Sequence, residues 1–422
     1  MEKRMSKPRL GLIGKPLGHS WSPEIHKYLT GADYKLWEID EGELPGFMKR
    51  REFDGINVTI PYKASVIEYL EEIDEAADRM GAVNCIVNRD GRLKGYNTDY
   101  IGLLKMMKRM DAADKAGGGK AVILGTGGAS KAAEEACRKL GIEFEKVSRS
   151  EREGCITYEE LKQRGEEFAL LINATPVGMY PNEDEAPVDV SQFGSLGLVV
   201  DIVANPVRTR LCYEAEQHGI PSAGGLEMLV YQALAAEEIF TGEDLPEAKA
   251  DECVEQLLAE RRNIVLIGMP SSGKSTVGRL LAERLGREFI DTDDEIVSRA
   301  GRPIAEIFAE DGEAEFRKIE REVCEIFSKK SGLVIACGGG VVEFEENMRR
   351  LAYNGIIIYL DRSLELLTPT ESRPLSPDKN KLAVLYERRK ELYERYSDIR
   401  IRNDGSAEDA ADEIIREIQN EL

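Results

Sequence analysis

A glycine-rich stretch in the second half of the chain has the residue types that hold phosphate. The sequence NIVLIGMPSSGKST, residues 263–276, fits the spacing G-x-x-x-x-G-K-[ST]. In such a loop backbone N–H groups surround a phosphate, the lysine adds a point charge, and the following hydroxyl can ligate Mg²⁺. A strand-like run precedes the loop and a helix-like run follows it, so we predict a nucleotide site. The residues assigned to this site are Gly268, Ser272, Gly273, Lys274, Ser275 and Thr276.

Two carboxylates, Asp291 and Asp293, follow this unit in the stretch FIDTDDEI. Spaced by two residues at the end of a strand, both can lean over bound phosphates. ATPases, GTPases and kinases all use such loops, and the strand IIIYLD, which ends in Asp361, could serve as the metal-holding strand of a motor ATPase. However, no Glu follows Asp361 directly, and no N-K-x-D guanine motif is present. The 160 residues from 263 to 422 suit a small-metabolite kinase.

A second glycine-rich loop, LGTGGAS, lies in the first half of the chain between a strand-like and a helix-like run. It approaches the dinucleotide pattern G-x-G-x-x-G, although Ser130 replaces the third glycine. NAD sites place a carboxylate at the end of the next strand. The stretch FEKVSRS offers an arginine between two serines there, which suits the 2′-phosphate of NADP. We therefore predict NADP(H) as cofactor, bound by Gly125, Gly127, Gly128, Ala129, Ser148 and Arg149.

Short apolar runs that alternate with helical patterns must position these loops. Such runs include LGLIG, FDGINVTI, FALLINAT, LGLVVDIV, GLVIACGG and GIIIYLD, and their alternation predicts parallel α/β layers. The stretch MDAADKAGGGK, residues 110–120, reads as a loose connection, and residues 237–262 read as acidic helix. We expect an α/β substrate domain over residues 1–105, completed by returning helices at 225–260, a Rossmann NADP-binding domain over 106–224, and a P-loop kinase domain with a parallel sheet over 261–422.

The composition favours small-molecule partners. The formal net charge is −21 and no Lys/Arg run stands out, so we expect neither nucleic acid nor an anionic membrane as a partner. No 18-residue apolar stretch is present, and the apolar run near the start is too short for a signal peptide. Seven scattered cysteines without a C-x-x-C pair indicate reduced thiols in a cytoplasmic protein. The sequence does not determine the oligomeric state.

The second half resembles shikimate kinase over residues 263–422. The stretches that carry this resemblance are the phosphate loop, FIDTDDEI, AEFRKIE, CGGG, SRPL and RKELY. The resemblance implies that Asp291 helps Ser275 to hold Mg²⁺ and that Asp293 is the base facing the acceptor hydroxyl. It places Arg373 on a lid where, with Lys274, it contacts the transferring phosphate. The shikimate carboxylate would be held by Arg317, Gly339 and Arg389.

The first half resembles shikimate dehydrogenase over roughly residues 8–260. The stretches that carry this resemblance are IGKPLGHSWSPEIH, NVTIPYK, GAVNC, GYNTDYIG, INATPVGM, NPVRT and GLEMLVYQ. The resemblance implies that Lys63 and Asp99 form the catalytic pair. Hydride transfer to a ketone makes an alkoxide that must gain a proton, and a lysine beside a carboxylate can supply it. The substrate would be held by Ser20 and Ser22 at its carboxylate, and by Thr59, Asn84 and Gln232 at its hydroxyls.

Together the two halves predict a bifunctional enzyme. It would reduce 3-dehydroshikimate to shikimate with NADPH, and phosphorylate shikimate with ATP and Mg²⁺. One alternative is a quinate/shikimate dehydrogenase fused to another small-metabolite kinase, since Ala204 replaces a usual tyrosine and could relax the pocket. The other is a regulatory protein that retains the folds, which we expect to have lost Lys63, Asp99, Lys274 or Asp293. Two further departures are Cys85 in place of threonine and Cys337 in place of a small hydroxyl residue.

Overall fold

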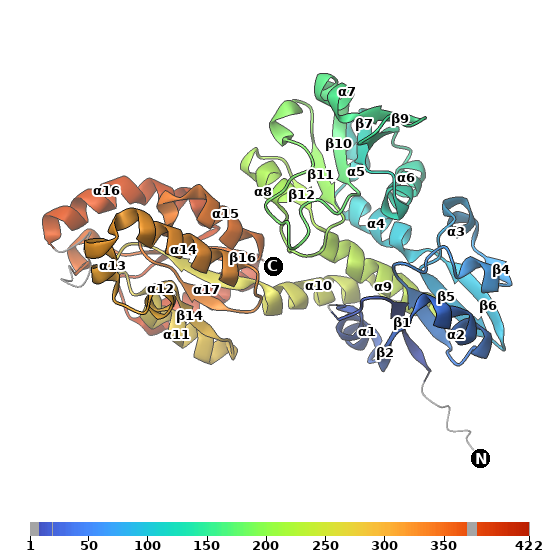
Figure 1. Ribbon diagram of the computed structural model, residues 1–422, viewed down its shortest axis with the longest axis horizontal. Helices are drawn as coiled ribbons and strands as arrows, with labels where there is room; N and C mark the ends of the chain where they lie inside the picture. The colour runs from blue at the N-terminus through green and yellow to red at the C-terminus, as the bar shows by residue number, and fades with distance from the viewer. Residues whose placement is uncertain (1–7, 19, 369–377, 422) are drawn as a thin grey trace, which may run out of the picture. The chain divides into compact units, whose positions relative to one another are not determined.

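The computed structural model describes residues 8–18, 20–368 and 378–421, and it confirms the α/β class with three sheets (Figure 1). The chain divides into two compact units. The first unit comprises Met1–Asn205 and Glu214–Val254, and the second comprises Pro206–Tyr213 and Glu255–Leu422. Among the described residues, no helix has the length and apolar character needed to cross a membrane.

The first sheet is mixed and has the strand order β2-β1-β3-β5-β6-β4. Its strands are β1 (Leu10–Gly14), β2 (Tyr34–Glu38), β3 (Gly55–Val58), β4 (Glu72–Ile73), β5 (Cys85–Arg89) and β6 (Arg92–Tyr96). Strand β1 runs parallel to β2 and β3, whereas β5 runs antiparallel to both β3 and β6. The two strands predicted for this sheet, in LGLIG and FDGINVTI, are parallel as expected, and β5 adds antiparallel pairings that the sequence analysis did not predict. Asp90 and Gly91, with φ of 53° and 82°, form the two-residue turn that Asp-Gly favours between antiparallel strands.

The second sheet confirms the Rossmann domain. All its pairings are parallel and its order is β12-β11-β10-β7-β8-β9. The strands are β7 (Lys120–Leu124), β8 (Phe144–Ser148), β9 (Cys155–Thr157), β10 (Phe168–Asn173), β11 (Leu198–Asp201) and β12 (Ser222–Ala223). The strand order reverses between β7 and β10, and ligands of such sheets bind at the carboxyl ends of the strands at this point. The glycine loop after β7 lies at that position.

The helices correct two details of the sequence analysis. They are α1 (Ser22–Thr30), α2 (Leu44–Arg50), α3 (Glu75–Met80), α4 (Thr98–Arg109), α5 (Ala112–Ala116), α6 (Gly128–Leu140), α7 (Tyr158–Gln163), α8 (Arg210–Gln217), α9 (Gly225–Thr241) and α10 (Glu247–Arg261). The expected loose connection at 110–120 contains α5. The acidic stretch 237–262 forms two helices, because Gly242 caps α9 in a left-handed conformation with φ of 75°.

Helices α4 and α9 pack closely in the first unit. At Gly102 on α4, an added Cβ would lie 2.6 Å from the carbonyl oxygen of Met228 and 2.9 Å from Cβ of Gln232. Only a glycine allows the two helices to approach this closely. The contact joins α4, which carries Asp99 in its first turn, to α9, which carries Gln232.

The second unit has a five-stranded sheet with the order β14-β15-β13-β16-β17, and every pairing in it is parallel, as predicted. Its strands are β13 (Asn263–Ile267), β14 (Phe289–Asp291), β15 (Val334–Ala336), β16 (Gly355–Asp361) and β17 (Ile399–Arg402). Its helices are α11 (Lys274–Leu285), α12 (Thr292–Ala300), α13 (Ile304–Glu310), α14 (Gly312–Ser328), α15 (Glu345–Tyr353), α16 (Lys379–Tyr396) and α17 (Ala407–Glu421).

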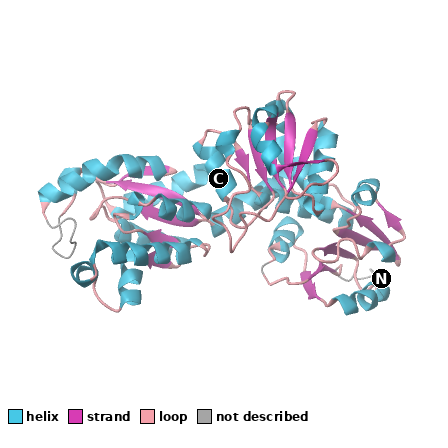
Figure 2. Cartoon of the chain, turned by 45° about the horizontal axis from the view of Figure 1, so that its top comes forward, coloured by secondary structure: helices cyan, strands magenta, loops and turns pink. Residues whose placement is uncertain are grey.

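Helices cover both faces of this sheet (Figure 2). Alternate residues of β13 enter different cores: Ile264 and Leu266 pack with residues of α11 and α17, whereas Val265 and Ile267 pack with residues of α14 and α15. A strand buried on both faces reads as a continuous apolar run, which is why NIVLI carries no alternation. The functional loops lie at the carboxyl ends of the strands, outside these two cores.

Candidate active sites

The phosphate loop of the second unit connects β13 to α11. Gly268 and Gly273 have φ of 145° and 96°, and a Cβ at Gly268 would lie 2.6 Å from the carbonyl oxygen of Leu360. Lys274 is buried, and its Nζ donates to the carbonyl oxygens of Gly268 at 3.0 Å and Met269 at 2.9 Å. The loop therefore closes around its own lysine and holds a positive charge at the start of a helix, where phosphate binds.

A hydroxyl and a carboxylate meet beside the loop. Ser275 Oγ donates to Asp291 Oδ2 at 2.6 Å, while Asp291 Oδ1 accepts from the backbone N–H of Asp293 at 3.0 Å. Asp291 thereby caps α12 and fixes the backbone that carries Asp293. Serine and carboxylate oxygens are the hard donors that Mg²⁺ takes, usually with several waters and substrate phosphates, so the donor set fits that ion.

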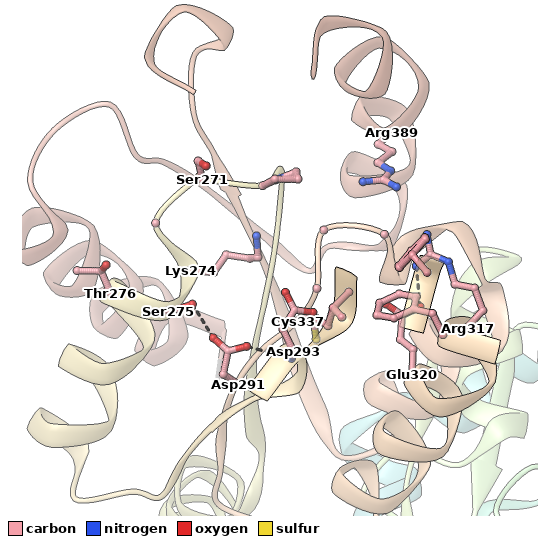
Figure 3. Close-up of a pocket in the computed structure, with 18 residues that line it drawn as sticks. Ser271, Lys274, Ser275, Thr276, Asp291, Asp293, Arg317, Glu320, Cys337 and Arg389 are labelled. Atoms are coloured by element: carbon pink, nitrogen blue, oxygen red, sulfur yellow. Dashed lines mark hydrogen bonds and ion pairs between the residues drawn. The ribbon is translucent and has the colours of Figure 1, made fainter. Parts of the chain in front are cut away.

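A cavity of about 490 Å³ opens beside the loop (Figure 3). A Cβ at Gly338 would lie 2.6 Å from Asp293 Oδ1, so this glycine gives the carboxylate its space. The carbonyl oxygen of Gly339 accepts from the Tyr393 hydroxyl at 2.5 Å. The cavity walls bring together most of the residues predicted for this site, namely Gly273, Lys274, Ser275, Thr276, Asp291, Asp293, Arg317, Gly339 and Arg389.

The two arginines of the cavity are buried, and carboxylates hold them. Arg317 donates from Nη1 to Glu320 at 2.9 Å, from Nε and Nη2 to Glu313 at 3.2 and 3.0 Å, and from Nη2 to Glu343 at 3.3 Å. Arg389 donates from Nη2 to Glu343 at 2.9 Å. The sequence analysis assigned the arginines but missed these three glutamates. The i, i+3 spacing of Arg317 and Glu320 on one helix was an available signal for one of them.

Burial changes the chemistry of two side chains in this cavity. It raises the pKa of Glu320, which is 1% exposed, although the charge of Arg317 acts in the opposite direction. It also raises the pKa of the Cys337 thiol, and this effect outweighs the opposing charge of Lys274. A raised pKa keeps the thiol protonated at neutral pH, which disfavours a role as nucleophile.

Two other residues of this half, one predicted for the site and one considered and set aside, remain to be placed. Arg373 lies outside the described residues. Asp361 is buried, and its carboxylate accepts from Arg400 at 2.7 Å, from Arg402 at 2.8 Å and from the Tyr359 hydroxyl at 3.1 Å. These bonds engage both carboxylate oxygens, which argues against the metal-holding role considered for a motor ATPase.

In the first unit, the structure brings the predicted Lys63 and Asp99 together. Lys63 Nζ lies 2.7 Å from Asp99 Oδ2, and the other oxygen of Asp99 accepts from Asn84 Nδ2 at 2.8 Å. Asp99 lies in the first turn of α4, where Asn97 caps the helix by accepting from its N–H at 3.1 Å. The side chains of Lys63 and Asp99 are 30% and 20% exposed, so solvent and a small substrate can reach them.

A buried chain of hydrogen bonds supports this pair. The Asn84 side chain accepts from Thr98 N–H at 2.6 Å and donates to Thr98 Oγ1 at 3.1 Å. Thr98 Oγ1 in turn donates to Gln232 Oε1 at 3.1 Å, and Gln232 donates to the carbonyl oxygen of Leu229 at 3.0 Å. The structure thus connects Asn84 and Gln232, both predicted, through Thr98, which the sequence analysis missed although it lies within the motif N-T-D.

Three further predicted residues follow strands β1 and β3 of the first sheet. Ser20 Oγ donates to Ser22 Oγ at 3.2 Å and accepts from Ser22 N–H at 3.3 Å, at the start of α1. Thr59 follows β3, and its N–H donates to the carbonyl oxygen of Ile13 at 2.9 Å. The two hydroxyls of the first loop form the donor group that a ligand carboxylate would require.

The glycine loop of the Rossmann domain has the expected local geometry. Gly125 has φ of 105°, and a Cβ there would lie 3.0 Å from the carbonyl oxygen of Ala174. Gly127 is the N-cap of α6, Gly128 is its first residue and Ala129 follows. The backbone N–H groups of this first turn therefore point out of the N-terminus of the helix. Ser130, which replaces the third glycine, donates from Oγ to the carbonyl oxygen of Gly127 at 2.8 Å.

The end of β8 carries the residues predicted to select the cofactor. Ser148 is buried at the last position of the strand, and its Oγ accepts from Ser150 N–H at 3.4 Å. Arg149 directly follows the strand and is exposed. An exposed guanidinium at this position can reach a phosphate on the cofactor ribose.

The folds and sites define a dinucleotide-dependent dehydrogenase joined to a P-loop kinase of small molecules. Comparison with known proteins gives the particular families. Residues 12–86 match the shikimate dehydrogenase substrate binding domain, residues 225–252 match the shikimate 5′-dehydrogenase C-terminal domain, and residues 270–419 match shikimate kinase. The chain belongs to the shikimate dehydrogenase family, and it carries a shikimate kinase domain.

Individual relatives support this assignment for the first unit. The shikimate dehydrogenase (NADP(+)) of Clostridium beijerinckii is 38% identical over 250 residues, which cover 54% of this chain and 90% of that protein. The chorismate mutase/shikimate 5-dehydrogenase fusion protein from Clostridium acetobutylicum is 35% identical, with a TM-score of 0.56 over 60% of this chain and 98% of that one. The shikimate 5-dehydrogenase of Thermus thermophilus, in complex with NADP(H) and shikimate, is 31% identical, with a TM-score of 0.54 over 59% of this chain and 99% of that one.

Proposed function

We propose that this chain catalyses two consecutive reactions of the shikimate pathway: the NADPH-dependent reduction of 3-dehydroshikimate to shikimate, and the ATP-dependent phosphorylation of shikimate to shikimate 3-phosphate. The observation that carries the proposal is that one chain contains both family domains, each with its reactive groups assembled. The product of the first site is the substrate of the second.

In the dehydrogenase reaction, Lys63 and Asp99 manage the proton. NADPH supplies the hydride when it is bound. As the substrate carbonyl oxygen gains negative charge, the ammonium of Lys63 donates a proton to it, and Asp99 at 2.7 Å keeps the lysine oriented. Asn84 donates to the other oxygen of Asp99, which favours the orientation in which the carboxylate faces the lysine. Ser20 and Ser22 bind the substrate carboxylate, while Thr59 and Gln232 contact its hydroxyls.

The cofactor preference follows from the residues after β8. Arg149 would donate charge-assisted hydrogen bonds to the 2′-phosphate of NADPH, and Ser148, its neighbour in the chain, would support this contact. Gly125, Gly127, Gly128 and Ala129 let the pyrophosphate approach the N-terminus of α6. NADH lacks the 2′-phosphate and therefore binds without the contribution of the arginine.

In the kinase reaction, the residues align shikimate with the terminal phosphate of ATP. Asp293 accepts the proton of the attacking hydroxyl, and Lys274 stabilises the charge that develops on the transferring phosphoryl group. Arg317, Arg389 and the backbone at Gly339 bind the shikimate carboxylate at the far end of the cavity. Mg²⁺, held by Ser275 and Asp291, would supply further neutralisation of phosphate charge. Arg373, which lies outside the described residues, keeps the phosphate-contacting role that the family resemblance implies.

A coupled assay tests the proposal. Purified protein is supplied with 3-dehydroshikimate, NADPH, ATP and MgCl₂, and we expect NADPH oxidation, ADP release and shikimate 3-phosphate in equal amounts. Omission of ATP should stop the reaction at shikimate, and supplying shikimate with ATP alone should give the phosphate. Quinate and NADP⁺ form the comparison arm, in which kcat/KM well below that for shikimate is expected. Equal kcat/KM for quinate, or no phosphorylation of shikimate, would contradict the proposal.

A further inference from the structure

A glutamate lies between the two arginines of the kinase cavity. Glu343 ends the short helical segment Val341–Glu343 that follows the three glycines, and its side chain is 8% exposed. One oxygen, Oε2, accepts from Nη2 of both Arg317, at 3.3 Å, and Arg389, at 2.9 Å. The other oxygen forms an ion pair with Arg388. A single carboxylate oxygen therefore bridges the pair of guanidinium groups.

The hydrogen-bond capacity of Arg317 limits what else it can bind. A guanidinium has five N–H donors, and four hydrogen bonds of Arg317 already go to Glu313, Glu320 and Glu343. One N–H donor, on Nη1, is left over, so a ligand carboxylate that takes two donors from Arg317 must displace one of these glutamates. Of the three, Glu343 is the one that accepts hydrogen bonds from both arginines, so a ligand carboxylate held by both would compete with it for their donors.

We propose that Glu343 is an internal competitor for the substrate carboxylate and sets the affinity and selectivity of this pocket for acidic substrates. The inference rests on the proposed function, because the carboxylate in question is that of shikimate. Before substrate binds, Glu343 balances two buried cations, which would otherwise be costly to keep in a cavity. When substrate binds, one carboxylate is exchanged for another, so the exchange contributes less affinity than binding to unoccupied arginines would.

This arrangement has a consequence for selectivity. A buried polar site usually rejects a ligand that lacks the matching group, because its own groups are left without partners. Here Glu343 keeps both arginines paired when a ligand brings no carboxylate. The pocket should therefore discriminate only weakly between shikimate and an analogue whose carboxylate is replaced by a neutral carboxamide.

The first test is Glu343→Gln, which keeps the shape of the side chain and removes its charge. The KM for shikimate is measured in the ATP-dependent reaction without nicotinamide cofactor, so that the readout reports the kinase site alone. We expect KM to fall by about threefold to tenfold, as charge-assisted bonds to the substrate strengthen. Glu313→Gln is the matched control: it removes a half-exposed partner of Arg317 alone and should change KM by a smaller factor. An unchanged or raised KM in the Glu343 variant would overturn the inference.

The second test uses the unmodified protein and is independent of any effect of substitution on folding. The ratio of kcat/KM for shikimate to that for its carboxamide analogue is measured at the kinase site, and we expect a ratio below about a hundredfold. A ratio of about ten-thousandfold, as for a site whose polar groups are left unpaired, would refute the role of Glu343. Failure of the proposed function would be seen differently, as absence of shikimate phosphorylation by the unmodified protein.

Discussion

In the dehydrogenase unit one lysine meets one aspartate, whereas in the kinase unit two arginines meet three glutamates. The lysine and aspartate side chains are 30% and 20% exposed, while the side chains of Arg317 and Arg389 are 6% and 2% exposed. A partly exposed pair can separate at small cost because water replaces the lost contact. Buried arginines cannot, since an unpaired buried charge is strongly unfavourable. The dehydrogenase pair is thus suited to proton transfer, and the arginine cluster to holding a fixed charge.

The largest expected effect tests whether proton transfer depends on the exposed pair. Lys63→Ala removes the proton donor, so we expect kcat/KM for ketone reduction to fall by about 10²- to 10⁴-fold. Kinase turnover, measured with shikimate and ATP, should stay near that of the unmodified protein. Lys35→Ala, at an exposed position of β2, is the control and should leave both reactions intact. Loss of both activities in a folded Lys63 variant would contradict the separation of the two sites.

The next effect concerns the buried lysine of the phosphate loop. Lys274→Ala removes the positive charge that the proposed mechanism places at the transferring phosphate, and we expect kinase kcat/KM to fall by about 10²- to 10³-fold. Ketone reduction with NADPH should be unaffected. The exposed Lys318 provides the control, because Lys318→Ala removes a lysine from the same unit without touching the loop. Near-normal phosphorylation by the Lys274 variant would show that the loop is not the nucleotide site.

A third effect tests whether an exposed arginine can select between two cofactors that differ by one phosphate. Arg149→Ala should weaken the binding of NADPH by roughly tenfold to a hundredfold, because charge-assisted bonds to the 2′-phosphate are lost. KM for NADH should change little, and Arg152→Ala, at a nearby exposed position, is the control. Equal weakening of the two cofactors would exclude the assigned role of Arg149.

The smallest expected effect extends the comparison to stability. Burial opposes the charged form of Asp361, but hydrogen bonds from Arg400 and Arg402 outweigh it and lower the pKa of the carboxyl. A lowered pKa stabilises the folded state above the unfolded value of about 3.9, and this stability is lost as the pH falls through the folded pKa.

The change Asp361→Asn should therefore reduce the free energy of unfolding of the kinase unit at pH 7 by about 1.5–3 kcal/mol. The difference should shrink as the pH is lowered below about 4, as measured by urea denaturation at a series of pH values. Asp294→Asn, at an exposed position, should show no comparable dependence on pH. If the difference in unfolding free energy grew toward low pH, the pKa of Asp361 would be raised in the folded state and not lowered.

The sequence predicted what depends on local spacing. The phosphate loop and the parallel kinase sheet follow from a motif and from apolar runs, and the structure confirms that sheet. The Lys63–Asp99 pair was implied only by the family resemblance, because the two residues are far apart in the sequence, and the structure brings them together. The antiparallel β5–β6 hairpin was missed although its Asp-Gly turn is visible in the sequence. Glu343 could not be assigned in advance, because its role depends on arginines from two other helices that reach it only in the folded chain.

The close contact at Gly102 bears on how the substrate range of this protein could be redesigned. A methyl group there would collide with the carbonyl oxygen of Met228 and with Cβ of Gln232, so α9 would have to shift away from α4. Such a shift would enlarge the space near Gln232 while every side chain that faces the substrate kept its identity. Directed evolution toward bulkier ring acids could therefore begin at the crossing of these two helices and leave the catalytic groups unaltered.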